Sequence, residues 1–223
     1  MSQTLGGLKL VFADEALLLL DKPAGLLCVP GRGADKQDSL SARVQATYPD
    51  ALVVHRLDMA TSGLVLMARG IANQRKLSAA FEAREVYKRY VAWVAGNTNA
   101  AEADAQAWST IELPISADWP NRPRQTVNLE QGKPSTTRWR QAPAAAQNNT
   151  GLSTRVELEP LTGRTHQLRV HMAAIGHPIL GDALYAPADI AELAERLMLH
   201  AATLSFAHPA TGATMQFESH APF

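Results

Sequence analysis

Asp58 is the residue of this chain whose sequence surroundings are best suited to chemistry. Two basic residues, His55 and Arg56, come just before it, and the small residues Thr61-Ser62-Gly63 follow shortly after it. Hydroxyl side chains and a glycine suit a sharp turn, so we expect this segment to present the carboxylate. A carboxylate placed in this way can act as a nucleophile or as a general base.

Two apolar runs must position this turn. Val53-Val54 leads into it, and residues 64–67 lead out of it. The second run is typical of a strand that is buried on both faces. The residues between the runs are mostly polar, so they do not suit a buried core and do suit a functional site. The sequence therefore predicts a carboxylate on a turn that ends against a buried strand.

The segment 55–70 resembles the catalytic segment of the RluA-type RNA pseudouridine synthases, which isomerise uridine to pseudouridine in RNA. Five further segments resemble the other motifs of that family and follow in the expected order. Together the motifs cover most of the chain. The five segments are residues 21–26, 88–92, 161–171, 176–182 and 199–201.

The resemblance implies catalytic roles for three residues. Asp58 would be the catalytic carboxylate, either as a nucleophile that adds to the sugar or as a base that promotes elimination, and both routes stay open. Arg169 would pair with this carboxylate and keep it ionised in a site that excludes water. Tyr90 would stack on the base and help to remove the C5 proton.

The target uridine is stacked within RNA and must be flipped out before it can react. Arg56 is the candidate for filling the vacated space, because a flat cation can stack and form hydrogen bonds at once. The resemblance implies that Leu168 forms an apolar wall against the uracil, and simple core packing is an equally good interpretation. Both residues are therefore candidates for substrate binding.

Four more candidate substrate-binding residues carry two interpretations each. His55 assists the reaction or only braces the turn. Arg164 and His166 contact the RNA backbone or support the cleft of the family's fold. Lys22 contacts RNA in the same way or ends a strand as an ordinary solvated charge.

Strands and helices are mixed without a steady βαβ alternation, which favours an α+β fold. The resemblance implies the pseudouridine synthase fold, a mixed and mostly antiparallel bent sheet with flanking helices and a central cleft. The 223 residues suit a single catalytic domain over residues 1–223. Because the first motif begins by Asp21, we expect no N-terminal accessory RNA-binding domain.

Apolar periodicity and capping residues predict the individual elements. Asp38 is expected to cap a helix that runs to about Tyr48 and ends before Pro49. Low-complexity stretches at 97–107 and 142–151 are expected to form exposed loops. Further helices are expected at 71–84, 165–175 and 189–197, and strands at 9–12, 17–20, 87–94, 202–207 and 214–218.

The composition excludes several classes of protein. The chain lacks the run of about 18 apolar residues that a transmembrane helix needs, and it lacks a signal-peptide pattern. Its single cysteine, Cys28, forms no internal disulfide and is expected to pack as a small hydrophobe. These features favour a cytoplasmic protein that binds no membrane, and no oligomerisation stripe is visible, so we expect a monomer.

The spacing of the histidine and cysteine residues argues against a bound metal ion, and the chain shows no motif for a phosphate-containing cofactor. His166 and His171 are not spaced as a metal-binding helix pair, and no cysteine pair or phosphate-binding loop is present. We therefore expect no metal and no small-molecule cofactor.

The formal net charge of zero counts against a nucleic-acid binder, but basic residues concentrate at 69–93 and 119–140. The short length and the run Asp118-Trp119-Pro120-Asn121-Arg122-Pro123 resemble the subgroup that acts on large-subunit ribosomal RNA and on the tRNA anticodon arm. We therefore expect a ribosomal RNA, a tRNA stem-loop or both as the partner. Which uridine reacts stays open.

Two other functions remain possible from the sequence. One is a non-catalytic RNA-binding module that keeps the fold. The other is a nucleoside or glycoside hydrolase with paired carboxylates, for which Asp21 or Asp182 would supply the second acid.

Overall fold

The computed structural model of the chain describes residues 3–98, 107–143 and 152–223, so most of the two predicted low-complexity loops lies outside the described residues. The chain folds as two compact units. Unit 1 comprises Met1–Lys88 and Ala201–Pro222, and unit 2 comprises Arg89–His200 and Phe223. The chain enters unit 2 within β6 (Tyr87–Ala95) and leaves it within β12 (Leu199–Ala207). The expectation of one catalytic domain over residues 1–223 stays a prediction.

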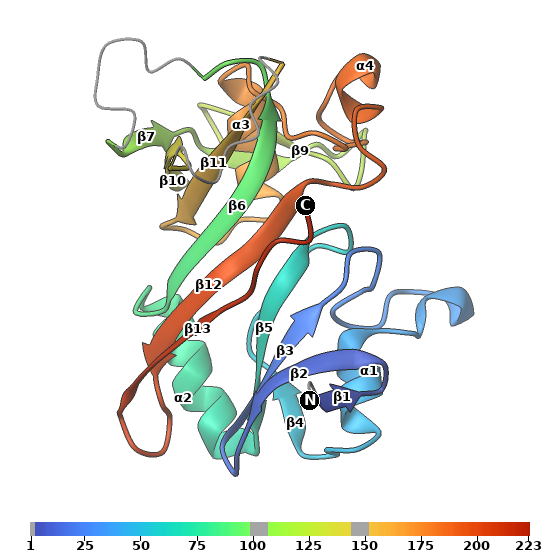
Figure 1. Cartoon of the computed structure of the whole chain (residues 1–223), viewed down its shortest axis with the longest axis vertical. Coiled ribbons are helices and arrows are strands. Elements are labelled where there is room, and N and C mark those ends of the chain that lie inside the picture. The colour runs from blue at the N-terminus through green and yellow to red at the C-terminus, as the bar shows by residue number, and fades with distance from the viewer. Residues whose placement is uncertain (1–2, 99–106, 144–151) are drawn as a thin grey trace. The chain divides into compact units, whose positions relative to one another are not determined.

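Unit 1 is built on a sheet with the strand order β1-β2-β3-β5-β12 (Figure 1). The pairs β1–β2, β2–β3 and β3–β5 are antiparallel, and β4 also pairs with β5 and β13 with β12 in the antiparallel sense. All residues of β5 except Arg69 are buried, so the strand predicted to be covered on both faces is confirmed. The strands are β1 (Gln3–Leu5), β2 (Leu8–Ala13), β3 (Leu17–Lys22), β4 (Ala51–Val53), β5 (Ser62–Arg69), β12 and β13 (Thr214–Glu218).

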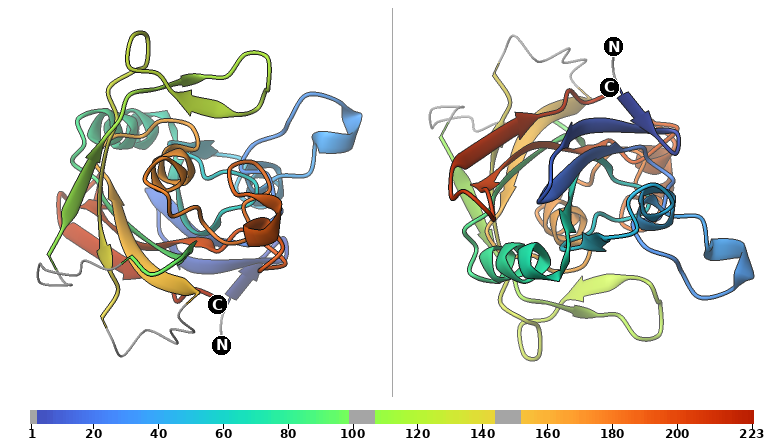
Figure 2. Two further views of the ribbon diagram at one scale, coloured as in Figure 1. Left: turned by 90° about the horizontal axis from the view of Figure 1, so that it is seen from above. Right: turned by 90° about the horizontal axis from the view of Figure 1, so that it is seen from below.

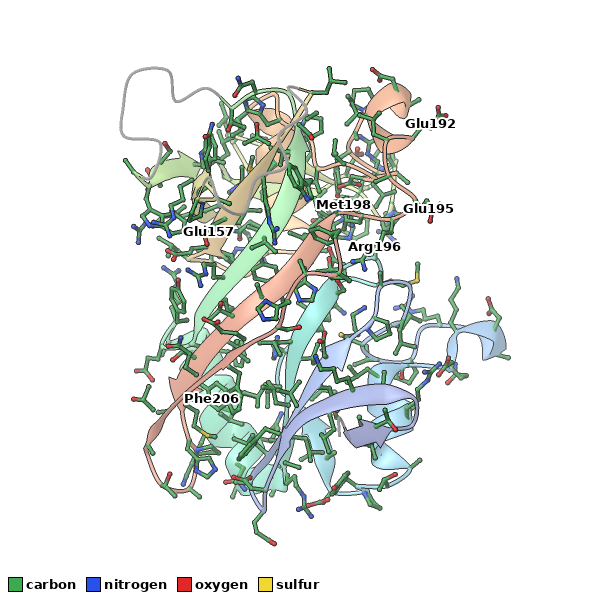
Figure 3. All side chains as sticks on the ribbon, in the orientation of Figure 1. Glu157, Glu192, Glu195, Arg196, Met198 and Phe206 are labelled. Atoms are coloured by element: carbon green, nitrogen blue, oxygen red, sulfur yellow. The ribbon has the colours of Figure 1, made fainter. Side chains whose placement is uncertain are left out.

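The core of unit 1 lies between this sheet and the helix α2 (Ile71–Glu82). Leu77 of α2 is buried against strand residues, and Ala80 and Phe81 pack beside it on the same helix face, as the sequence predicts. Phe206 of β12 belongs to the same core (Figure 3). The strand side chains of this cluster are Leu17, Leu19, Leu64, Leu66, Ala68, Leu204 and Phe206.

The helix predicted from Asp38 to Tyr48 is shorter, and its cap was assigned wrongly. The helix α1 spans Leu40–Gln45, and Ser39 is its N-cap, with the Ser39 hydroxyl accepting the Ala42 N–H at 3.2 Å. Asp38 instead forms a two-point ion pair with Arg43, at 2.7 and 2.6 Å. Serine and aspartate are nearly equal as caps. Because Asp38 pairs with Arg43, Ser39 is left to cap the helix.

The helix predicted at 71–84 is confirmed, but it ends at Glu82. Arg84 takes a left-handed conformation with φ of 62°. The Glu85 N–H then reaches the Ala80 carbonyl at 2.9 Å, and the Arg84 N–H reaches the Phe81 carbonyl at 3.3 Å. These two bonds satisfy carbonyls that the helix end leaves open and form a Schellman motif, here without its usual glycine.

Unit 2 contains a second antiparallel set with the order β6-β11-β10-β7 and a separate two-stranded ribbon, β8–β9 (Figure 2). Glu157 of β11 lies between Arg140 and Arg89, with its carboxylate 2.6 Å and 3.6 Å from their guanidinium nitrogens (Figure 3). The remaining strands are β7 (Ser109–Glu112), β8 (Ile115–Ala117), β9 (Gln125–Val127), β10 (Thr136–Gln141) and β11 (Ser153–Pro160).

The helices of unit 2 are shorter than the sequence predicts. The helix α3 spans Gln167–Ala174, and His166 before it is left-handed with φ of 54°. The helix predicted at 189–197 is wrong in length, because α4 spans only Ala188–Ala191. After residues 192–196, which form turns and bends, the Met198 N–H donates to the Leu180 carbonyl at 2.9 Å. The predicted α+β class with a mixed, mostly antiparallel sheet is confirmed.

Candidate active site

The turn that carries Asp58 in unit 1 begins earlier than the hydroxyl residues suggest. The Thr61 N–H donates to the Asp58 carbonyl at 3.1 Å, which closes a turn over residues 58–61. Ser62 and Gly63 already belong to β5, so the predicted Thr61-Ser62-Gly63 turn is displaced toward Asp58. Asp58 is partly exposed, and Arg56 and Met59 are exposed. The turn therefore presents an acid and a neighbouring cation at the surface of the unit.

Gly63 allows another backbone to pass close to the start of β5. Its φ is 114°, and a Cβ at this position would overlap the backbone of Ala201 in β12. Only glycine meets both conditions without distortion. The strand that follows the Asp58 turn is thus locked against its neighbour.

The backbone on both sides of Asp58 is held by the segment 22–28. The Leu57 N–H donates to the Cys28 thiol at 3.2 Å, and the Gly25 N–H donates to the Met59 carbonyl at 2.8 Å. The Lys22 ammonium donates to the same Met59 carbonyl at 3.0 Å. Hydrogen bonds at residues 57 and 59 fix the backbone from which the Asp58 side chain projects.

Lys22 is fully buried, so the interpretation as an ordinary solvated charge is wrong. Besides the Met59 carbonyl, its ammonium donates to the carbonyls of Pro23 and Leu26 at 2.8 and 2.7 Å. A buried cation survives only with such partners. The predicted contact of Lys22 with RNA stays a prediction, and the ammonium is already occupied by these three carbonyls.

Cys28 lies among three of the charged groups of this region. Burial raises the pKa of its thiol, and Lys22, Asp58 and Arg56 all act on it electrostatically. Cys28 is only 4% exposed and packs as the small hydrophobe predicted from the sequence. Unit 1 therefore brings Lys22, Arg56 and Asp58 into one neighbourhood around this side chain.

His55 is held between β5 and α2, which supports the interpretation as a bracing residue, and its assistance to the reaction stays a prediction. Its Nε2 accepts the Leu66 N–H at 2.9 Å, and its ring stacks on Phe81 with centroids 4.5 Å apart. Burial lowers the pKa of His55 to about 3, and the charge of Lys88 acts in the same direction. The ring is thus neutral near pH 7 and serves as a hydrogen-bond acceptor for β5.

Unit 2 holds Arg169 in a two-point ion pair with Asp182. Arg169 Nε lies 2.8 Å from one carboxylate oxygen and Nη2 lies 2.6 Å from the other, and the two side chains are 6% and 0% exposed. The Asp182 carboxylate also accepts the N–H groups of Leu184 and Tyr185 at 3.0 and 3.2 Å. The guanidinium plane is fixed by these contacts. The predicted pairing of Arg169 with Asp58 stays a prediction.

Tyr185 connects several residues that the sequence treats separately. Its hydroxyl lies 2.6 Å from His166 Nδ1 and accepts the Gln125 N–H of β9 at 2.8 Å. The Arg169 guanidinium lies 5.0 Å from the centre of its ring. The sequence reasoning missed Tyr185, because its contacts come from two segments, one at Gln125 and one at residues 166–169, that are distant from each other along the chain.

The other predicted residues of unit 2 lie around α3 and on β6. Leu168 is buried at the start of α3, and Tyr90 lies in β6 opposite Leu158 of β11. The Arg164 guanidinium donates to the Pro134 carbonyl through two nitrogens, both at 3.3 Å. Arg164 and His166 therefore support the loops beside α3, and their predicted contacts with RNA stay predictions.

The two candidates for a second acid are both engaged elsewhere. Asp21 pairs with Lys9 at 3.3 Å and accepts the Ser219 hydroxyl at 2.7 Å. Asp182 is 1% exposed and is occupied by Arg169 and two backbone N–H groups. Both carboxylates are thus occupied by other partners, which weakens the hydrolase hypothesis.

The described residues form neither a metal-binding cluster nor a helix that could span a membrane. Within those ranges, no three His, Cys, Asp or Glu side chains gather in an arrangement that would hold a metal ion. No helix in the same ranges combines the length and apolar character that a bilayer crossing requires.

Residues 16–174 match the family described as RNA pseudouridylate synthase. The chain is 46% identical over 216 residues to the dual-specificity RNA pseudouridine synthase RluA of Escherichia coli K12, covering 97% of this chain and 94% of that protein. The protein of the same name from Yersinia pestis is 46% identical over 213 residues, covering 96% and 98%.

Among solved structures, the human protein named RNA Pseudouridylate Synthase Domain Containing 1 is similar with a TM-score of 0.77 and 27% identity. That similarity covers 100% of this chain and 87% of the human chain.

Proposed function

We propose how this chain, which belongs to the RNA pseudouridylate synthase family, carries out its isomerisation of uridine to pseudouridine in RNA. The reaction breaks the bond between the sugar C1′ and the base N1, turns the uracil and rejoins it through C5. It needs a carboxylate near the sugar, a pocket that retains the loose base and a group that helps to remove the C5 proton.

Asp58 is the catalytic carboxylate in this proposal. One observation carries it: Asp58 is partly exposed on a turn whose backbone is fixed by hydrogen bonds at Leu57, Met59 and Thr61. Fixing the backbone before substrate arrives lowers the entropic cost of placing the carboxylate against a sugar carbon. Attack on the sugar and assisted elimination both remain compatible with this role.

Arg169 and Tyr90 assist Asp58 in this proposal. The Arg169 guanidinium is permanently charged and its plane is held by Asp182, which suits it to favour an ionised carboxylate. Tyr90 offers a phenol that stacks on the uracil and takes part in the removal of the C5 proton. Leu168 supplies an apolar wall against the base.

Arg56 fills the space that the flipped uridine leaves. It is exposed two residues before Asp58, just ahead of the turn. Flipping costs roughly a few kcal/mol, and least for a base that is already unpaired. A guanidinium that stacks on the neighbouring bases offsets part of that cost.

The proposed substrates are large-subunit ribosomal RNA and the anticodon arm of tRNA. The bacterial relatives are named dual-specificity enzymes, and sequence-specific proteins usually read RNA in single-stranded loops. We further propose a cytoplasmic monomer that uses no metal or small-molecule cofactor and binds no membrane.

The test incubates the purified chain with a large-subunit ribosomal RNA transcript and with a tRNA anticodon stem-loop, without metal or nucleotide. Digestion to nucleosides then quantifies pseudouridine and free uracil in each RNA. The proposal expects pseudouridine in both substrates and no free uracil. Free uracil would instead support the hydrolase, and binding of either RNA without any product would support the non-catalytic module.

A further inference from the structure

The tip of the β8–β9 ribbon, residues 118–124, exposes a tryptophan. Trp119 is 67% exposed, whereas the other three tryptophans of the chain, Trp93, Trp108 and Trp139, are partly buried. An indole left in water forgoes the burial that normally stabilises it. We call residues 118–124 the hairpin tip.

Arg122 stacks on the exposed indole. Its guanidinium carbon lies 3.5 Å from the centre of the Trp119 ring. Both residues are exposed, and so is Arg124 two positions later. A cation held over an aromatic ring restricts the rotamers of both side chains, so less freedom is lost when a ligand binds.

The backbone of the hairpin tip is closed by its own hydrogen bonds. The Asp118 N–H donates to the Arg124 carbonyl at 3.0 Å, and the Arg124 N–H donates to the Asn121 carbonyl at 3.0 Å. The Asn121 amide donates to both oxygens of the Asp118 carboxylate, at 3.1 and 3.0 Å. The tip is therefore a preorganised turn that presents one indole and two guanidinium groups.

The tip end of the ribbon is tied to the helix α3 through Tyr185. The Gln125 N–H at the start of β9 donates to the Tyr185 hydroxyl, which also contacts His166, the residue preceding α3. Arg124 lies over the same tyrosine ring, 5.5 Å from its centre. Figure 2 shows the ribbon, in light green, as an element apart from the larger sheet. These contacts give the tip a fixed place in unit 2.

We propose that the hairpin tip binds unpaired bases of the RNA substrate outside the reacting uridine, with a base stacked on Trp119 and phosphates contacted by Arg122 and Arg124. The inference rests on the proposed function, since it takes the partner to be RNA. Every base has a face that stacks on an indole, and arginine binds phosphate oxygens with two nitrogens. The ribbon thus selects RNAs that present a single-stranded loop next to the modified position.

Affinity for the anticodon stem-loop tests this proposal in Trp119→Ala and Trp119→Phe, with Leu193→Ala as the matched control. Leu193 is also in unit 2 and is 53% exposed. We expect Trp119→Ala to raise the Kd by about 5- to 150-fold, the range for the loss of one stacked base. We expect Trp119→Phe to recover most of the affinity and Leu193→Ala to match the unaltered chain.

Salt dependence and kinetics provide the second readout. Arg122→Ala is expected to reduce the slope of log Kd against log salt by about one, as for the loss of one phosphate contact. In pseudouridine formation, the loss in Trp119→Ala is expected in KM rather than in kcat. Melting temperatures of all variants should agree, because the altered side chains are exposed.

Two results would overturn the inference. One is an unchanged Kd in Trp119→Ala, and the other is an equal loss in Trp119→Ala and Trp119→Phe, which would exclude stacking. Failure of the proposed function is a separate outcome, because the unaltered chain would then form no pseudouridine whatever the tip binds.

Discussion

Arg169 and Asp182 form a buried two-point ion pair, with nitrogen–oxygen distances of 2.8 and 2.6 Å. The same geometry recurs at the surface of unit 1 between Arg43 and Asp38, at 2.7 and 2.6 Å. The two pairs differ in their exposure to water. Comparing the two pairs therefore separates the effect of burial on the free energy of unfolding from the effect of ion-pair geometry.

Asp182→Asn should destabilise the chain strongly, by about 3–5 kcal/mol, because it leaves the buried Arg169 charge without its partner. It should also lower kcat more than it weakens RNA binding, since the orientation of Arg169 is lost. Urea unfolding and steady-state kinetics measure the two effects. Asp38→Asn is the control and should change the free energy of unfolding far less. Equal losses in the two variants would contradict the account.

Lys22→Met should cost about 2–4 kcal/mol of unfolding free energy, because three carbonyls lose a charged donor in a buried site. Met59, whose carbonyl is one of the three, follows Asp58 directly, so kcat should fall in the folded variant as well. Lys9→Met removes an exposed lysine of the same unit and serves as the control. If Lys22→Met were as stable and active as Lys9→Met, the proposed support of the Asp58 turn would be refuted.

Gly63→Ala and Gly25→Ala separate steric overlap from backbone strain. Both glycines have positive φ, of 114° and 84°. A Cβ at Gly63 meets the Ala201 backbone, whereas a Cβ at Gly25 meets nothing within 4 Å. Gly25→Ala should therefore cost only about 1–2 kcal/mol of strain, and Gly63→Ala distinctly more. Thermal unfolding of the two variants ranks them, and the reverse order would show that β5 and β12 are not closely packed there.

The stability of the chain should fall in acid through His55. Its pKa is about 3 in the folded chain, below the ordinary value of 6.5. Between these values the unfolded chain binds a proton that the folded chain does not. The contribution of His55 is therefore complete above pH 6.5 and declines by about 1.4 kcal/mol per pH unit as the pH falls toward 3.

His55→Gln removes this titration and keeps an acceptor for the Leu66 N–H. The difference in unfolding free energy between the unaltered chain and His55→Gln should shrink with falling pH below 6.5. Urea unfolding at several pH values measures it. A difference that stayed constant across this range would mean that His55 is not held neutral by the fold.

The sequence predicts those elements whose residues carry their own signal. The apolar run at 64–67 is buried in β5 as expected, and the face of α2 formed by Leu77, Ala80 and Phe81 packs on the core. Local rules failed where two residues competed for one role, as Asp38 and Ser39 did for the cap of α1. They also failed at α4, which ends at Ala191 although a helix is predicted to continue to residue 197.

From the sequence, the types of residue in the candidate site could be predicted, but their contacts could not. Lys22 looks like a solvated charge in the sequence, because its three carbonyl partners come from a loop and from a turn 37 residues away. Tyr185 gave no signal, because its role depends on Gln125, His166 and Arg169 meeting around it. Such contacts are properties of the fold and not of any local pattern.

The most direct test of the central claim, that Asp58 is the catalytic carboxylate, is the release of tritium from RNA labelled at C5 of uridine. The unaltered chain should release tritium into water without added metal or nucleotide. Asp58→Asn should release none while it binds the same RNA and unfolds at the same temperature, and the control Asp50→Asn should behave like the unaltered chain. Tritium release by a folded Asp58→Asn at the rate of the unaltered chain would contradict the account.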